Sequence, residues 1–459
     1  MSKRKQSRKT KHLLTQSINP HAAGIDIGAE ELMAAIPVDL DDQPVRRFDT
    51  FTQDLHHLRN WLLENGITTV AMESTGTYWI PTYDILEAAG IQVCLVNARH
   101  IKGVPGKKTD VCDAQWLQQL HTAGLLRASF RPTSEVIATR QIMRHRSQLI
   151  KDASRHLQHM QKALTEMNLK IHHVFSDLDG LSSMNIIESI LDGQRDPEAL
   201  WQLRHKNSRV TKDTFLKAIQ ADWQPAQLFI LQQCHTNWTH TRKLISDCDH
   251  TIAKHMAQVP SESSEPVPDA HWKQRRLSKN DLSIDIYQEA YRYYGVDLST
   301  IDGISAGTLT ILMSELGNAQ DILKNFRHAK AFTSWLGLCP DNRISGGKIL
   351  KSKTRRVVNR IAGTLRMAAQ GLTNAKCAMG DYCRRMKARL GKAEATTAVA
   401  HKLARLIYCL ISSKQPYDEK KAFPATEKNA ARKLKALKKL AQSLNMEITP
   451  KQSLTETVI

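Results

Sequence analysis

The chain lacks any long apolar run. No stretch approaches the ~20 consecutive apolar residues that a helix needs to cross a bilayer. The opening MSKRKQSRKTKH also lacks the apolar core that a secretory signal contains. We therefore expect a soluble, cytoplasmic protein without a membrane partner.

Acidic residues are scarce relative to basic ones. The chain has 45 Asp and Glu against 65 Lys and Arg, which gives a formal charge of +20 and a pI of about 9.6. Such an excess favours a polyanionic partner, above all nucleic acid. With 459 residues, 41% of them hydrophobic, the chain is long enough for two or three domains with separate cores.

Cysteines are few and scattered, eight in the whole chain. Two groupings stand out, Cys234-His235 with Cys248 and His250, and Cys377 with Cys383. Neither has a zinc-finger spacing. We expect free thiols in a reducing compartment, without disulfides.

The N-terminal third combines a basic arm with an α/β pattern. Residues 1–20 form an arm with six Lys or Arg before position 12 and no acidic residue, which indicates disorder. In residues 21–130, AAGIDIGAEELMAAIPV predicts two strands around a turn at Gly28. The segments TTVAME and IQVCLVNA predict further strands, YDILEAAG a helix, and a second helix begins near Thr109. Alternation of this kind is typical of an α/β domain.

Residues 131–258 are expected to be helical. An a/d heptad seam runs through residues 143–175. Its two interleaved series are Ile150, Leu157, Leu164 and Ile171, and Ala153, Met160, Met167 and Val174. The seam predicts a coiled coil, either between molecules or antiparallel, and a core helix of a bundle is the alternative.

The C-terminal part holds most of the positive charge. Residues 259–290 include VPSESSEPVPDA and are predicted to be a linker. A third domain is expected over 291–412, where residues 342–411 carry sixteen Lys or Arg and only two acidic residues. Residues 413–459 form a basic tail in which KNAARKLKALKKLAQSL predicts a helix with leucines on one face.

Four acidic residues occupy informative places in the N-terminal domain. Asp26 lies in GIDIG, where a strand meets a turn, and Glu73 ends the strand VAME. Asp110 and Asp113 lie three apart at the start of a helix and share one face. Each has an ordinary alternative as a helix cap, a first-turn charge or a surface residue.

Taken together, these four carboxylates can converge in a ribonuclease-H-like fold. Their mutual repulsion requires a cation, and oxygen-only ligands select Mg²⁺ or Mn²⁺. Such an ion can bridge carboxylates and a scissile phosphate. Lys107 and Lys108, just before Asp110, would suit an approaching phosphate backbone.

The third domain contains two further motifs. IDGISAGTLTILMSELG is typical of a helix-hairpin-helix, which offers backbone N–H groups to phosphates. Ser345 precedes Gly346 and Gly347, so its hydroxyl lies on a turn among cations and could attack a phosphodiester, although Ser-Gly-Gly is also common in plain loops. The basic residues that follow are predicted to bind nucleic acid, and they are Lys348, Lys351, Lys353, Arg355, Arg356, Arg360 and Arg366.

GIDIG, AMESTGTYW and KKTDVCDAQ occur in an order and spacing that resemble the DEDD-type transposases of insertion sequences, which are bridge-RNA-guided serine recombinases. Residues 337–366, with Cys-Pro, Ser-Gly, Asn-Arg and Leu-Arg, resemble the transposase domain of that family. The resemblance covers residues 20–130 and 295–412 well, and the middle and tail poorly. One departure is the helix start KSKTRRVVNR, whose spacing differs from the commonest version.

The resemblance implies a fold and a site. The fold is a ribonuclease-H-like (resolvase-like) domain, a central helical coiled-coil region and a C-terminal α-helical transposase domain. Asp26, Glu73, Asp110 and Asp113 would hold Mg (or Mn), and Ser345 would be the nucleophile. The partners would be double-stranded donor and target DNA, a noncoding guide RNA and further copies in a dimer or tetramer, in which the tetrad of one protomer works beside the serine of another.

The leading hypothesis is therefore an RNA-guided transposase that exchanges DNA strands through a covalent phosphoserine. Two alternatives stay open. One is a metal-dependent, structure-selective DNA nuclease without a serine nucleophile. The other is a basic nucleic-acid scaffold whose carboxylates bind metal structurally.

Overall fold

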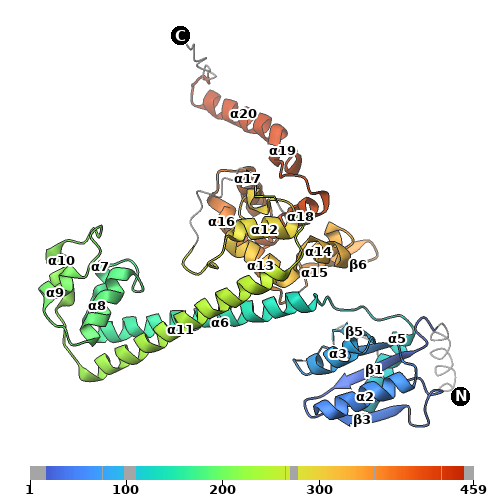
Figure 1. Ribbon diagram of the computed structural model, residues 1–459. Coiled ribbons are helices and arrows are strands. Elements are labelled where there is room, and N and C mark those ends of the chain that lie inside the picture. Colours follow the sequence, from blue (N-terminus) through green and yellow to red (C-terminus); the bar gives the residue numbers. More distant parts are fainter. Residues whose placement is uncertain are drawn as a thin grey trace. The chain divides into compact units, whose positions relative to one another are not determined.

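The fold is taken from a computed structural model, which describes residues 17–74, 76–97, 110–263, 265–268, 278–355, 357–424 and 426–448. The side chains of residues 110–112, 343, 349, 351 and 426–433 are not described. The chain divides into two compact units, Met1–Arg131 and Pro132–Ile459, and Figure 1 labels most of their elements. None of the helices in the described ranges is long and apolar enough to span a bilayer.

The first unit is a mixed five-stranded sheet with helices. In the sheet order β3-β2-β1-β4-β5, β1 pairs antiparallel with β2 and β2 with β3, whereas β4 runs parallel to both β1 and β5. The expected α/β layout is thus confirmed. The elements are β1 (Ala22–Ile27), β2 (Glu31–Ala35), β3 (Val45–Asp49), α2 (Thr52–Glu64), β4 (Thr69–Glu73), α3 (Trp79–Ala88), β5 (Gln92–Val96) and α5 (Asp110–Thr122).

Side chains alternate between the two faces of this sheet. Ile25 of β1 and Met72 of β4 are fully buried in one apolar core with Leu58 of α2 and Leu86 of α3. On the other face α5 packs on β1, β2 and β4. The contact with β1 is close because residue 24 is glycine.

At Gly24 an added Cβ would lie 2.4 Å from the carbonyl oxygen of Ala114 and 2.3 Å from the backbone nitrogen of Gln118. Near the other end of α5, His121 Nε2 lies 2.8 Å from Oγ1 of Thr69, the first residue of β4. The C-terminus of α5 therefore lies beside the start of β4, and its N-terminus lies toward the carboxyl ends of β1 and β4.

The second unit begins with a long helical hairpin, which Figure 1 shows as two helices side by side, joined through four short helices. Its elements are α6 (Ser134–Glu166), α7 (Ile171–Val174), α8 (Leu181–Leu191), α9 (Pro197–Gln202), α10 (Lys212–Ile219) and α11 (Pro225–Gln258). Met160 and Leu164 of α6 are buried with Leu231 and Cys234 of α11.

The heptad seam therefore packs within one chain, antiparallel to α11. It is also shorter than expected. The helix ends at Glu166, and Asn168 has a φ of 57°. Ile171 and Val174 belong to the separate one-turn helix α7.

A buried ion pair crosses this hairpin. Arg146 of α6 bonds Asp249 of α11 through both Nε and Nη2, and the side chains are 6% and 10% exposed. Arg146 also donates to the carbonyl oxygens of Asn280 at 2.9 Å and Asp281 at 3.2 Å. One guanidinium thus joins α6, α11 and the segment that leads to the C-terminal helices.

The rest of the second unit is mostly helical. Its elements are α12 (Ile286–Tyr294), η2 (Leu298–Thr300), α13 (Ala306–Leu316), α14 (Ala319–Asn325), α15 (Ala329–Trp335), β6 (Pro340–Ser345), β7 (Lys348–Thr354), α16 (Arg360–Gly371), η3 (Leu372–Asn374), α17 (Ala378–Leu390), α18 (Lys392–Ser413), α19 (Glu419–Ala422) and α20 (Thr426–Ser443). The buried helix α18 packs against α15, α16 and α17.

The prediction that the C-terminal transposase domain is all helical needs correction. Its strands β6 and β7 form a two-stranded antiparallel sheet. The first four residues of KSKTRRVVNR therefore belong to β7, and the helix begins only at its last residue, Arg360. In the expected helix-hairpin-helix, Gly303, at a φ of 90°, separates α13 from the three-residue 3-10 helix η2.

Candidate active site

Asp26 and Glu73 lie side by side at one end of the sheet. The parallel register pairs Ile25 with Met72, so Asp26 and Glu73 follow the last pair by one residue each. Adjacent strands are about 4.8 Å apart. Both side chains are half-buried, and both alternate with the residues of the α2 and α3 core, so they face α5.

The N-terminus of α5 approaches the same end of the sheet. Ala114 lies against Gly24, two residues before Asp26, and Asp113 precedes it. Asp110 begins the helix one turn earlier, but its side chain is not described. Asp113 is exposed. Lys107 and Lys108 lie outside the described residues.

The residues at this end fit a divalent cation by their donor chemistry. Carboxylate oxygens are the ligands of hard cations such as Mg²⁺. Among the side chains that the structure describes, no group of three or more His, Cys, Asp or Glu is placed to hold a metal. The described carboxylates alone therefore do not complete the predicted tetrad.

Ser345 ends β6 at the tip of a two-residue hairpin. The turn is Gly346-Gly347, with φ of 53° and 75°. A type I′ turn requires positive φ at both positions, which glycine adopts without strain. Ser345 pairs with Lys348 across the turn, so their side chains lie on one face, and both are exposed. The structure thus brings the predicted nucleophile next to one predicted cation.

The other predicted basic residues are spread more widely. Lys353 pairs with Asp341 on the hairpin, and the backbone of Lys351 pairs with that of Arg343. Arg355 donates to the carbonyl oxygen of Ser334 at 2.6 Å. Arg356 lies outside the described residues, and the half-buried Arg366 lies within α16, beyond the hairpin.

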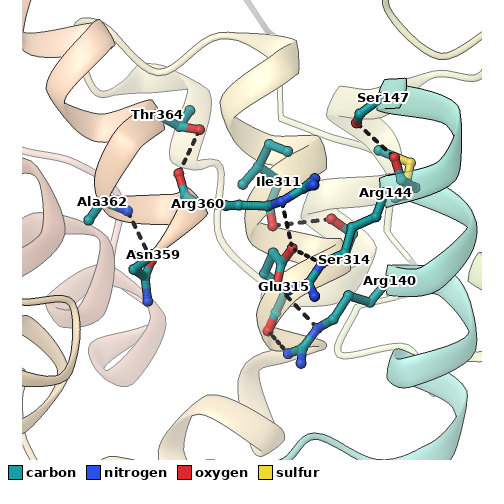
Figure 2. Close-up of polar contacts among 11 residues, drawn as sticks. Arg140, Arg144, Ser147, Ile311, Ser314, Glu315, Asn359, Arg360, Ala362 and Thr364 are labelled. Carbon is teal, nitrogen blue, oxygen red and sulfur yellow. Dashed lines mark hydrogen bonds and ion pairs between the residues drawn. The ribbon is translucent and has the colours of Figure 1, made fainter. Parts of the chain in front are cut away.

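A polar cluster that sequence reasoning missed surrounds Glu315 of α13, whose side chain is 10% exposed (Figure 2). Arg144 of α6 donates from Nε to Oε1 at 3.1 Å and from Nη2 to Oε2 at 2.8 Å. Arg140, one turn earlier, places Nε 3.1 Å from Oε2. Arg360 of α16 places Nε 3.9 Å from Oε1. We call these four residues the Glu315 cluster.

Local structure explains how the cluster is held. The i, i+4 spacing puts Arg140 and Arg144 on one face of α6. Asn359 caps α16 because its Oδ1 accepts the backbone N–H of Ala362 at 3.1 Å, which fixes Arg360 at the first position of the helix. The spacing within α6 was the one available signal, and it did not identify Glu315 as the partner.

Comparison with known proteins gives two matches. A DEDD transposase domain model, described as a transposase, matches residues 23–169, which include all four predicted carboxylates. A second model, described as the IS116/IS110/IS902 family of transposases, matches residues 297–384, which include Ser345. No curated protein matches the chain. The DEDD domain implies dependence on a divalent metal. The chain therefore carries the domains of an IS110-family transposase and is an enzyme with DNA transposase or recombinase activity.

Proposed function

We propose that this transposase cuts and rejoins donor and target DNA through a covalent intermediate on Ser345. The observation that carries the proposal is the placement of Ser345. It is exposed at a hairpin tip opposite Lys348, within the region that matches a transposase model. An exposed hydroxyl beside an ammonium group is suited to attack a phosphate, because the cation offsets the charge that develops on oxygen.

The step balances without an external energy source. Ser345 Oγ forms a bond to phosphorus and loses its proton, and one P–O ester bond of the DNA strand breaks to release a strand hydroxyl. A hydroxyl of the exchanged strand then attacks the phosphoserine, re-forms a phosphodiester and frees the serine. The phosphodiester energy is conserved in the protein–DNA bond, so the reaction needs no ATP.

We further propose that the first unit is a ribonuclease-H-like (resolvase-like) domain that holds Mg (or Mn) on Asp26, Glu73, Asp110 and Asp113. The sheet order β3-β2-β1-β4-β5, with the first three strands antiparallel and the last two parallel to β1, supports this fold. The adjacency of Asp26 and Glu73 supports the site. A bound ion would neutralise charge on the phosphate oxygens.

The partners belong to the same proposal. The formal charge of +20 supports binding of double-stranded donor and target DNA and of a noncoding guide RNA. Assembly into a dimer or tetramer would allow the acidic site of one protomer to act beside the serine of another. The heptad seam gives this assembly no support, because α11 of the same chain covers it.

Replacing Ser345 tests the nucleophile. Ser345→Ala removes one exposed hydroxyl, so we expect folding and nucleic-acid binding to be unchanged and the covalent adduct to disappear. Ser352→Ala is the matched control, because Ser352 is an exposed serine on β7 of the same hairpin. The measurement is a denaturing gel of labelled donor and target DNA, with copurified RNA supplied, in which an adduct is a protease-sensitive shifted band.

Two results would contradict the proposal. An undiminished adduct in Ser345→Ala would assign the nucleophile to another hydroxyl. Cleavage by the wild-type protein that needs metal and yields no adduct would favour a structure-selective nuclease that uses the acidic residues alone.

A further inference from the structure

The Glu315 cluster carries more positive charge than its internal pairing requires. Three guanidinium groups lie around the one carboxylate of Glu315 at the place where α6, α13 and α16 meet. Charges held this close repel each other unless further anions approach. No step proposed above uses Arg144 or Glu315.

The three arginines of the cluster do not bind Glu315 equally strongly. Arg144 forms a bidentate pair with Glu315, and Arg140 approaches the same Oε2 atom and is mostly covered. Arg360 has only the 3.9 Å approach to Oε1, and its guanidinium makes no hydrogen bond to any residue in the described ranges. An arginine has five N–H donors, so most donors of Arg360 are available for a ligand.

The two outer arginines also reach solvent. The side chain of Arg144 is 47% exposed and that of Arg360 is 41% exposed, whereas Glu315 is only 10% exposed. The carboxylate thus lies beneath the guanidinium groups and holds them close together. An anion that arrives from solvent meets the arginines first.

Both arginines lie on regular helices. Arg144 lies within the 33-residue helix α6, and Arg360 is the first residue of α16, behind the Asn359 cap. The N-terminus of α16 adds a partial positive charge to the same place. Planar guanidinium groups bind phosphate oxygens in pairs, and a preformed arrangement loses little side-chain entropy on binding.

We infer that Arg144 and Arg360 together bind a phosphate of a nucleic-acid backbone, and that Glu315 is a positioning residue for both. The bound phosphate bridges α6 of the helical hairpin and α16 of the C-terminal helices. Contacts of this kind fix the register of a nucleic acid without reading its bases. The shared ligand chemistry is the phosphodiester, which duplex DNA and RNA both supply.

Salt dependence of binding is the test, with Arg360→Gln as the first variant. Its weak, half-exposed ion pair contributes little to stability. The dissociation constants for a labelled DNA duplex and for an RNA of the same sequence are measured between 50 and 200 mM salt. We expect the slope of log affinity against log salt to fall by about 0.9 for duplex DNA, or by about 0.7 for single-stranded RNA, because one phosphate contact is lost.

Over that fourfold range of salt, one contact corresponds to about a threefold change in affinity. The nucleic acid whose slope falls is the one bound at the cluster. Arg155→Gln is the control, because Arg155 is an exposed arginine on α6, the helix of Arg144, and is paired with Asp152. Its slopes should equal those of the wild type.

A second variant tests the positioning role of Glu315. Glu315→Gln removes the carboxylate that holds Arg144 and Arg360 close together, so affinity at low salt should fall if both arginines bind one phosphate. A purely structural cluster would instead give lower melting temperatures in both variants with unchanged affinities and slopes, and that result would overturn the inference. These measurements need no assay of catalytic activity. Ser345→Ala should keep the full slope, so failure of the serine proposal and failure of this one are distinguishable.

Discussion

The buried pair Arg146–Asp249 makes a sharp prediction about the helical hairpin. Replacing Arg146 by Met leaves the carboxylate of Asp249 in a site only 10% exposed and removes two bonds to backbone carbonyls. Breaking a buried ion pair by removing one partner costs about 3–5 kcal/mol. Because whole domains are stable by only about 5–15 kcal/mol, this single change should remove a fifth or more of the free energy of unfolding.

Replacing both partners should lower the free energy of unfolding less than replacing Arg146 alone. In the double variant Arg146→Met with Asp249→Leu, no unpaired charge stays buried, and apolar replacements of buried pairs are often close to neutral. We therefore expect the double variant to be more stable than Arg146→Met alone. Lys162→Met is the control on the same helix, because the exposed Lys162–Glu166 pair should contribute only about 0.3–0.5 kcal/mol.

Hydrogen exchange of peptides from α6 and α11 is the suitable assay, since a chain with several domains has no single unfolding transition. It reports the opening free energy of the hairpin itself. Two results would refute the reasoning: a loss below about 1 kcal/mol in Arg146→Met, or a loss in the double variant equal to the sum of the two single ones.

Two further predictions concern the first unit. Gly24→Ala should push α5 away from the sheet, because its Cβ would meet backbone atoms of α5 at 2.3 and 2.4 Å. We expect the free energy of unfolding to fall by about 1–3 kcal/mol and metal-dependent cleavage to be lost. Gly363→Ala, a helical glycine with open space around it, should leave cleavage intact, and equal stability and cleavage in the two variants would contradict the proposed packing. Burial lowers the pKa of His121 below its usual value of ~6.5. As the pH falls below ~6.5, the unfolded chain therefore binds a proton at His121 before the folded chain does, and the free energy of unfolding decreases. An NMR titration assigned with His121→Gln should show a midpoint below that of an exposed histidine, and a midpoint at or above about 6.5 would exclude the buried neutral ring.

The sequence predicted the strands that lie inside the sheet. β1 and β4 are apolar runs with a carboxylate at or next to their last residue, so both the strands and the places of Asp26 and Glu73 could be predicted. β3 was missed because VRRFD alternates charged residues at the edge of the sheet and has little apolar character. The helix α2 was missed with it. Its buried residues Leu55, Leu58, Trp61 and Leu62 follow a helical period that was open to detection.

Tertiary contacts between elements were harder to predict from the sequence than the helices and strands themselves. The heptads identified the buried side of α6, but a seam alone does not say whether its partner is α11 of the same chain or another molecule. The hairpin of β6 and β7 was missed, although Gly346-Gly347 between two short runs is a hairpin signal. The Glu315 cluster was not predictable, because 171 positions separate Arg144 from Glu315 and no local pattern records such a pairing.

The length of the helical hairpin can amplify small motions at the place where it is held. At 1.5 Å per residue, the 34 residues of α11 extend about 50 Å. The Arg146–Asp249 pair and the backbone of residues 280 and 281 hold the two helices part of the way along their length. From Asp249 to the first residue of α11, Pro225, the helix extends about 36 Å toward the four short helices α7 to α10. A tilt of about 5° at the Arg146–Asp249 pair would move that far end by about 3 Å. A small rearrangement near the pair would therefore produce a larger displacement of the short helices.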